Sequence, residues 1–285
     1  MRTYLYLCSM IVFPQAKINL GLNVVERRPD GYHNLETVFC EVPLHDALEV
    51  LPMDDRFPSA ADCDLKVTGI CIEGDERNNL VVRAYNMLKA EHPELPRVHV
   101  HLYKDIPSQA GMGGGSSDGA AMLKLLNTLF NLGYTREELI SKAAHLGADC
   151  PFFILGGAAY GEGIGELLQP VSLHLNGWYL GVVRPPIPVS TKEAFALVTP
   201  CRPALCCRAI VNDDVETWRD RLTNDFEKSV FAQYPEIGAI KERLYSLGAM
   251  YSSMSGSGSA VFGLFRQPVE LTPHFPHMFV KMVRL

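Results

Sequence analysis

The sequence contains no long hydrophobic run. Nowhere in its 285 residues do the ~18 consecutive apolar residues occur that a membrane-spanning helix requires. The opening segment from Tyr4 to Phe13 is apolar, but Arg2 is its only early positive charge and no A-x-A-like cleavage site follows. Its aromatic and β-branched residues instead predict a first strand. We therefore expect a cytoplasmic protein that does not associate with a membrane.

The sequence also lacks an excess of positive charge. Its 26 lysine and arginine residues stand against 32 aspartate and glutamate residues, which gives a formal net charge of −6. This balance provides no electrostatic footprint for nucleic acid or for an anionic membrane, so we expect no nucleic-acid partner. An anionic substrate would need locally concentrated positive charge. The length suits one large or two ordinary domains.

Disulfide and metal-binding motifs are missing as well. The 8 cysteines are scattered without C-x-x-C spacing, and only Cys206 and Cys207 are close together. This distribution is typical of reduced thiols rather than of a disulfide framework or a zinc site. His99 and His101 share one face of a predicted strand, but no third ligand is near them in the sequence. The sequence therefore identifies no metal ligands.

The most informative stretch runs from Pro107 to Asp118 and has the sequence P-S-Q-A-G-M-G-G-G-S-S-D. Glycine loses the most backbone freedom on folding, so such a run is a poor choice for a packed element. It leads directly into an apolar segment that predicts a helix from Ala120 to Phe130, and Ser116, Ser117 and Asp118 are good capping residues. Unpaired N–H groups and the helix dipole then favour phosphate binding. A flexible linker is the alternative, but both flanks are strongly apolar.

This loop differs from the two best-known phosphate-binding motifs. A P-loop requires a lysine after the glycines, and none follows here. The dinucleotide-binding pattern G-x-G-x-x-G fails because Ser116 stands where the third glycine should be.

Two charged residues occupy unusual places. Apolar and polar residues alternate from Lys17 to Val24, which predicts a half-buried strand whose polar face carries Lys17 and Asn19. Asp149 lies between a helix stop at Gly147 and an apolar, proline-led stretch, where a carboxylate is costly to desolvate without a partner. The ordinary alternatives are a solvated strand lysine and a turn aspartate.

An aromatic pair and a second glycine-rich loop complete the pattern. Tyr32 and His33 follow a Pro-Asp-Gly turn; a tyrosine ring can stack on a nucleobase and a histidine can hydrogen-bond its edge. The alternative is a hairpin shoulder without a ligand. Thr191 lies where a helix is predicted to begin after a proline-rich loop, and the segment from Met254 to Ser259 enters a strand. The strands and helices of the second half fit an α+β sandwich.

Several blocks, in order along most of the chain, resemble the GHMP kinase superfamily. The loop G-G-G-S-S-D, the block G-A-D-C-P-F-F and the segment M-S-G-S-G-S resemble its motifs. P-Q-A-K-I-N-L beside R-P-D-G-Y-H is similar to one branch, the 4-diphosphocytidyl-2-C-methyl-D-erythritol kinases. The departures are mild: Gln15 inside the first block, an N-terminal extension, Met112 for leucine and Cys150 for valine.

The resemblance implies a fold and a reaction. The fold is α+β, a two-domain GHMP kinase fold with an N-terminal domain like domain 2 of ribosomal protein S5, a ferredoxin-like C-terminal domain and the active site in the interdomain cleft. We expect residues 1–157 to form the ATP-binding and catalytic domain, and residues 158–285 to contribute to substrate binding. The reaction is ATP-dependent phosphorylation of the 2-hydroxyl of 4-diphosphocytidyl-2-C-methyl-D-erythritol in the non-mevalonate isoprenoid pathway. ATP and Mg²⁺ take part, and the enzyme would be a monomer or a homodimer.

The same resemblance implies roles for individual residues. Lys17 and Asp149 would be catalytic. The cytidine substrate would contact Asn19, Tyr32, His33, Thr191 and Phe195. ATP would contact Pro107, Gly111, Met112, Gly113, Gly114, Gly115, Ser116 and Ser117, with Asn79 and Lys104 near its adenine.

Two other functions are compatible with the superfamily. Another GHMP small-molecule kinase, of the homoserine or mevalonate type, would leave Tyr32 and His33 without a purpose. A non-catalytic, nucleotide-binding GHMP regulator would be expected to lack Lys17 or Asp149, and both are present.

Overall fold

The structure is a computed structural model, and it describes residues 10–71, 75–196 and 198–285. The chain forms two compact units. The first contains the described residues up to Gln15 together with His45–Ile106 and Gly114–Leu155, and the second contains Ala16–Leu44, Pro107–Gly113 and Gly156–Leu285. Two segments of the first half of the chain therefore belong to the second unit. The division into functional domains of 1–157 and 158–285 stays a prediction.

The first unit is built on a sheet with the strand order β1-β4-β6-β5. Its members are β1 (Met10–Val12), β4 (Ala47–Pro52), β6 (Val98–Lys104) and β5 (Cys63–Gly69). β5 runs parallel to β6, and the other neighbours are antiparallel. The strand predicted from Tyr4 to Phe13 is confirmed over β1, and its part before residue 10 lies outside the described residues.

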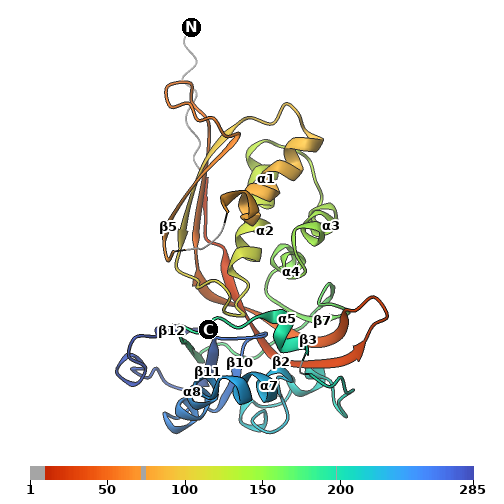
Figure 1. Cartoon of the computed structure of the whole chain (residues 1–285), viewed down its shortest axis with the longest axis vertical. Helices are drawn as coiled ribbons and strands as arrows, with labels where there is room; N and C mark the ends of the chain where they lie inside the picture. Colours follow the sequence, from red (N-terminus) through yellow and green to blue (C-terminus); the bar gives the residue numbers. More distant parts are fainter. Residues whose placement is uncertain (1–9, 72–74, 197) are drawn as a thin grey trace. The chain divides into compact units, whose positions relative to one another are not determined.

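Helices cover one side of this sheet (Figure 1). They are η1 (Glu76–Asn78), α1 (Leu80–Glu91), α2 (Gly114–Leu129), α3 (Arg136–Leu146) and α4 (Cys150–Leu155). None of the helices in the described parts of the chain is long and apolar enough to cross a bilayer.

Side-chain caps begin two of these helices. The Asn79 side chain accepts a hydrogen bond from the Val81 N–H at 2.9 Å, which starts α1. Thr135 and Glu138 form a complete capping box at the start of α3. Both caps follow local sequence patterns, an asparagine just before the helix and a Thr-x-x-Glu motif.

The start of α2 differs from the prediction. Ser116, Ser117 and Asp118 were expected to cap a helix beginning near Ala120, but α2 begins at Gly114, so these residues lie inside its first turns. Packing explains the early start, because a Cβ atom at Gly114 would lie only 2.8 Å from Cγ2 of Ile106. A glycine allows the helix to begin against that side chain.

The second unit contains two sheets. One has the order β2-β3-β7-β8 and consists of β2 (Gln15–Arg27), β3 (His33–His45), β7 (Ala158–Glu162) and β8 (Leu167–Pro170). The expectation that this strand is only half-buried is wrong. Most of β2 is buried, and its polar side chains are hydrogen-bonded within the protein: Lys17 donates to Asn19, and Asn19 donates to Thr37 on β3.

The other sheet of this unit is antiparallel, with the order β10-β11-β9-β12. Its strands are β10 (Tyr251–Met254), β11 (Val261–Phe265), β9 (Tyr179–Arg184) and β12 (Phe279–Arg284). The remaining elements of the unit are α5 (Thr191–Ala196), α6 (Cys207–Ile210), η2 (Val215–Thr217), α7 (Phe226–Gln233), α8 (Pro235–Ser246) and η3 (Thr272–His274).

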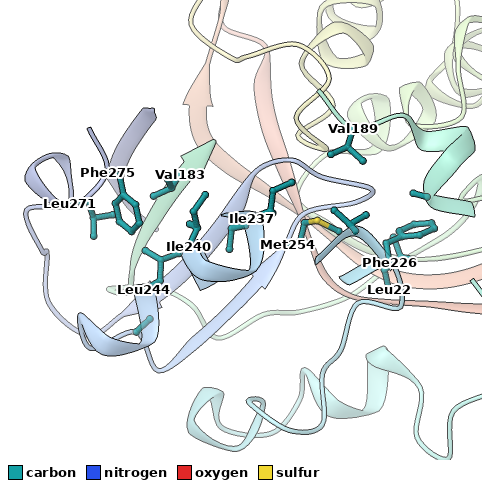
Figure 2. Packing of buried hydrophobic residues seen from close by; sticks show 14 of the residues in the cluster. Leu22, Val183, Val189, Phe226, Ile237, Ile240, Leu244, Met254, Leu271 and Phe275 are labelled. Atoms are coloured by element: carbon teal, nitrogen blue, oxygen red, sulfur yellow. The ribbon is translucent and has the colours of Figure 1, made fainter. Parts of the chain in front are cut away.

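An apolar core joins α8 to this sheet. Ile237, Ile240 and Leu244 recur on one face of α8 at the spacing that an amphipathic helix requires. Figure 2 shows them beside Val183 of β9 and Met254 of β10, all within one buried cluster.

Candidate active site

The tip of the glycine-rich loop needs glycine for steric reasons. Gly111 and Gly113 have φ angles of 73° and 68°, in the left-handed region. A Cβ atom on Gly111 would lie 1.8 Å from the carbonyl oxygen of Ser255, which no side chain could tolerate. At Gly115, in the first turn of α2, a Cβ atom would meet nothing within 4 Å. The start of α2 therefore faces open space that an anion can approach.

The loop tip is fixed within the second unit by hydrogen bonds. The Ser255 hydroxyl donates to the carbonyl oxygen of Gly111 at 2.8 Å. The N–H of Lys17, at the start of β2, donates to the carbonyl oxygen of Met112 at 3.0 Å. The backbone that carries the candidate catalytic lysine thus also holds the loop.

The side chain of Lys17 is buried in the same unit. It is 3% exposed, and its Nζ donates to Oδ1 of Asn19 at 2.6 Å. The Asn19 amide donates in turn to the Thr37 hydroxyl on β3 at 3.0 Å. Asn19 therefore has a hydrogen-bonded neighbour on each side. This fixes its side chain and, with it, the direction of the Lys17 ammonium.

The candidate catalytic aspartate lies close to the start of α2 within the first unit. Asp149 is half-buried and immediately precedes α4. A Cβ atom at Gly147, on the same turn, would be 4.0 Å from the Ser116 hydroxyl oxygen. Burial raises the pKa of the neighbouring Cys150 thiol to about 11, so this cysteine stays neutral. This unit therefore brings the Asp149 turn beside Ser116.

A hollow of about 570 Å³ opens in the first unit, beside the start of α1. Its volume falls in the range of roughly 300–1,000 Å³ that is typical of small-molecule sites. Asn79, predicted to lie near adenine, is one of the residues around it. The lining residues are Leu65, Val67, Thr68, Gly69, Ile70, Cys71, Asp75, Glu76, Asn78 and Asn79.

Lys104 is also in this region, but its side chain is buried. Its Nζ lies 2.6 Å from Oδ2 of Asp118 and also pairs with Asp46. Burial raises the pKa of Asp118 above its ordinary value, although the Lys104 ammonium opposes this shift. Burial alone would lower the pKa of Lys104, but the two carboxylates outweigh it and raise that pKa. The ammonium is thus held ionised away from solvent.

Of the predicted cytidine residues, Asn19 pairs with Lys17, and the other four lie elsewhere in the second unit. The His33 ring stacks on the Phe195 ring, with centroids 5.1 Å apart and planes 18° from parallel. Thr191 lies one turn earlier on α5, and its hydroxyl is 3.0 Å from the Ser257 hydroxyl. Tyr32 is 61% exposed at the end of its turn. An exposed ring and a stacked ring pair suit a planar ligand.

Comparison with known proteins identifies the family. The family model for the GHMP kinases N terminal domain matches residues 79–157, and that for GHMP kinases C terminal matches residues 207–271. A 4-diphosphocytidyl-2-C-methyl-D-erythritol kinase of Bacteroides fragilis is 52% identical over 263 residues, which cover 92% of this chain and 94% of that protein. The same kinase of Parabacteroides distasonis is 48% identical, with 91% and 93% covered. A crystal structure of 4-(cytidine 5'-diphospho)-2C-methyl-D-erythritol kinase superposes with a TM-score of 0.77 at 36% identity, covering 90% of each chain.

The chain belongs to the 4-diphosphocytidyl-2-C-methyl-D-erythritol kinase family. The predicted two-domain GHMP kinase fold is confirmed. The candidate site residues of this family member are divided between its two units. The first unit holds Asn79, Lys104, Gly114, Gly115, Ser116, Ser117 and Asp149, and the second holds Lys17, Asn19, Tyr32, His33, Pro107, Gly111, Met112, Gly113, Thr191 and Phe195.

Sequence analysis missed residues whose hydrogen bonds hold the candidate site in place. The Asn224 amide donates to the carbonyl oxygens of Met254 and Gly256, each at 2.8 Å, and so holds the second glycine-rich loop. In the sequence, Asn224 is visible only as the start of a helix. Asp46, which lies between β3 and β4, belongs to no recognisable motif.

Proposed function

We propose that this protein transfers the γ-phosphoryl group of ATP to the 2-hydroxyl of 4-diphosphocytidyl-2-C-methyl-D-erythritol, a step of the non-mevalonate isoprenoid pathway. The likeness to the Bacteroides fragilis kinase along nearly the whole chain carries this proposal. In the reaction, the hydroxyl oxygen bonds to the γ-phosphorus while the bond from that phosphorus to the β–γ bridging oxygen breaks. The hydroxyl proton is lost, and ADP leaves.

The glycine-rich loop and the start of α2 would bind the triphosphate. Open space at Gly115 and the unpaired N–H groups of the first helical turn support this role. The adenine would lie at the hollow beside Asn79. Mg²⁺ would enter with the nucleotide as part of the substrate, since no group of three or more His, Cys, Asp or Glu suited to a metal occurs among the described residues.

Lys17 and Asp149 would act on the hydroxyl and the transferring group. Phosphoryl transfer asks a protein mainly to position groups and to neutralise charge. The buried ammonium of Lys17 would stabilise negative charge as it develops, and Asp149 would accept the hydroxyl proton or orient that hydroxyl. Asn19 would keep Lys17 in place through the 2.6 Å hydrogen bond.

His33, Tyr32 and Phe195 would select the cytidine. A cytosine offers a hydrogen-bonding edge to His33 and two faces to aromatic rings, while Thr191 adds a polar contact. The stacked geometry of His33 and Phe195 supports this role, because it presents a flat aromatic surface next to an exposed Tyr32. We further propose that the protein is a cytoplasmic monomer or homodimer. The composition supports the absence of a nucleic-acid or membrane partner.

A coupled assay of ADP formation tests this function. The purified protein is given ATP, Mg²⁺ and either the diphosphocytidyl substrate, homoserine or mevalonate. We expect turnover with the cytidine substrate alone. Asp149→Asn should lose most of it, whereas Asp64→Asn, a half-buried carboxylate on β5 paired with His99, should not. Turnover with another alcohol would indicate a sister kinase, and ATP binding without turnover would indicate a regulator.

A further inference from the structure

Three charged side chains form a buried cluster in the first unit. The exposed fractions of the side chains are 2% for Lys104, 0% for Asp46 and 3% for Asp118. The Lys104 ammonium contacts both carboxylates, and its distance to Oδ2 of Asp118 is 2.6 Å. None of the three is among the groups that the phosphoryl transfer needs in contact with the reacting atoms.

The cluster joins both ends of the glycine-rich stretch. Oδ1 of Asp46 accepts hydrogen bonds from the N–H groups of Asp105 and Ile106, at 2.6 and 2.9 Å. These two residues immediately precede Pro107, where the loop begins. Asp118 lies in the first turns of α2, where the loop ends. Lys104 connects the two carboxylates and so ties the entry of the loop to its exit.

Lys104 also forms part of the framework around the hollow. Its carbonyl oxygen accepts the N–H of Ile70 at 2.9 Å, and a Cβ atom on Gly69 would lie 2.2 Å from that oxygen. Gly69 and Ile70 both line the hollow. On the other side, a Cβ atom on Gly114 would be 3.3 Å from Nζ of Lys104. Lys104 thus contacts two lining residues of the hollow through its backbone, and its side chain lies next to the start of α2.

Burying this cluster costs free energy that an apolar core would not. Each buried charge loses its hydration, and apolar residues of similar volume often replace buried ion pairs without loss of stability. Here two carboxylates share one ammonium, and Oδ1 of Asp118 is buried without a hydrogen-bond partner among the described residues. Stability alone does not account for such an arrangement, whereas fixed geometry at a binding site does.

We propose that Asp46, Lys104 and Asp118 are positioning residues that hold the start of α2 at a fixed place beside the hollow, so that one nucleotide meets both. Their buried side chains act by fixing the backbone, so Lys104, predicted to lie near the adenine, would serve there as a positioning residue. The idea rests on the proposed function, in which ATP uses both places. Residue 118 must provide an oxygen that accepts the Lys104 hydrogen bond, because this contact connects α2 to the cluster.

Variants of Asp118 test the proposal. We expect Asp118→Ala to weaken binding of a non-hydrolysable ATP analogue, and to raise the KM for ATP, by about tenfold or more, because small misplacements cost large factors. The KM for the cytidine substrate should change little. Asp118→Asn should restore most of the ATP affinity, because its amide oxygen can still accept from Lys104.

A matched control lies at the other end of the same helix. Asn127 of α2 makes two hydrogen bonds of 3.0 Å with the backbone of Tyr134. Asn127→Ala should lower the melting temperature but leave the KM for ATP unchanged. If Asp118→Ala does not fold, Asp118→Leu fills the volume and leaves the Lys104 and Asp46 charges balanced, so it provides the same comparison.

Two outcomes would overturn the proposal. If Asp118→Ala or Asp118→Leu changes ATP binding no more than Asn127→Ala does, the cluster is structural only. If Asp118→Asn binds the ATP analogue as weakly as Asp118→Ala does, the side-chain oxygen that accepts the Lys104 hydrogen bond does not position the nucleotide site. Failure of the proposed function is distinguishable, because the wild-type protein would then not phosphorylate the cytidine substrate, whereas the comparison of analogue binding among the variants requires no turnover.

Discussion

The Ser255 hydroxyl donates a hydrogen bond to the carbonyl oxygen of Gly111 at 2.8 Å. This contact joins two glycine-rich loops that are far apart in the sequence. The carbonyl oxygen of Ser255 also occupies the place that a Cβ atom on Gly111 would take. The shape of the first glycine-rich loop therefore depends on the loop that follows β10, which is itself held by the Asn224 amide.

Removal of this contact should impair ATP use more than stability. We expect Ser255→Ala to raise the KM for ATP by about tenfold, since the loop tip loses the bond that fixes Gly111. Ser252→Ala is the matched control, because its buried hydroxyl also donates to a backbone carbonyl at 2.8 Å, that of Phe262. Each variant should lose about 1 kcal/mol in the free energy of unfolding. Equal KM values for ATP in both variants would contradict the account.

Cys71 can report whether a nucleotide enters the hollow. Its thiol is exposed and belongs to the lining of the hollow, whereas Cys201 is exposed in the second unit. A bound ligand buries most of its surface against such a site, so an ATP analogue should slow alkylation of Cys71 and leave Cys201 unaffected. Mass spectrometry of the labelled peptides measures both rates in one sample. Unchanged labelling of Cys71 at a saturating analogue concentration would place the nucleotide elsewhere.

Loss of the Phe195 ring should affect only the cytidine substrate. Phe195→Ala removes the ring that stacks with His33, and base–aromatic stacking contributes roughly 1–3 kcal/mol. We expect the KM for the diphosphocytidyl substrate to rise by about tenfold or more, with the KM for ATP unchanged. Phe231→Ala, which removes a ring of the same size from α7, is the control. A rise in both KM values for Phe195→Ala would instead point to general damage.

The titration of Asp118 makes stability depend on pH. Burial raises its pKa in the folded protein, so the folded state holds this proton more tightly than the unfolded chain does. Protonated Asp118 therefore stabilises the folded protein below the pKa that this residue has in the unfolded chain. That contribution is lost as the pH rises through its pKa in the folded protein. Asp118→Asn has no such titration. The variant should therefore gain stability relative to the wild type as the pH rises from about 4 towards neutrality, which urea unfolding measures.

Local signals predicted much of the fold. The cap at Asn79, the capping box at Thr135 and the turn before Tyr32 involve residues a few positions apart, and the structure contains all three. The family could be recognised because its motifs are short and contiguous. The glycine-rich loop was visible for the same reason.

Features that depend on distant partners could not be predicted. Asp46 pairs with Lys104, 58 positions away, and Asn19 donates to Thr37, 18 positions away. The burial of these polar side chains therefore does not follow from the local sequence pattern. The polar face of β2 was expected to be only half-buried because Thr37, which accepts the Asn19 hydrogen bond, lies on another strand. The early start of α2 likewise depends on a tertiary contact, because Ile106 packs against Gly114.

The position of the new phosphate tests the central claim most directly. In the diphosphocytidyl substrate, the 2-carbon carries a methyl group and no hydrogen, whereas the other free hydroxyls are on carbons that carry hydrogen. We expect phosphorus NMR of the product mixture to show one new monophosphate ester resonance without splitting by a neighbouring proton. A split resonance would place the phosphate on another hydroxyl, and the absence of any new ester with ATP intact would contradict the kinase function.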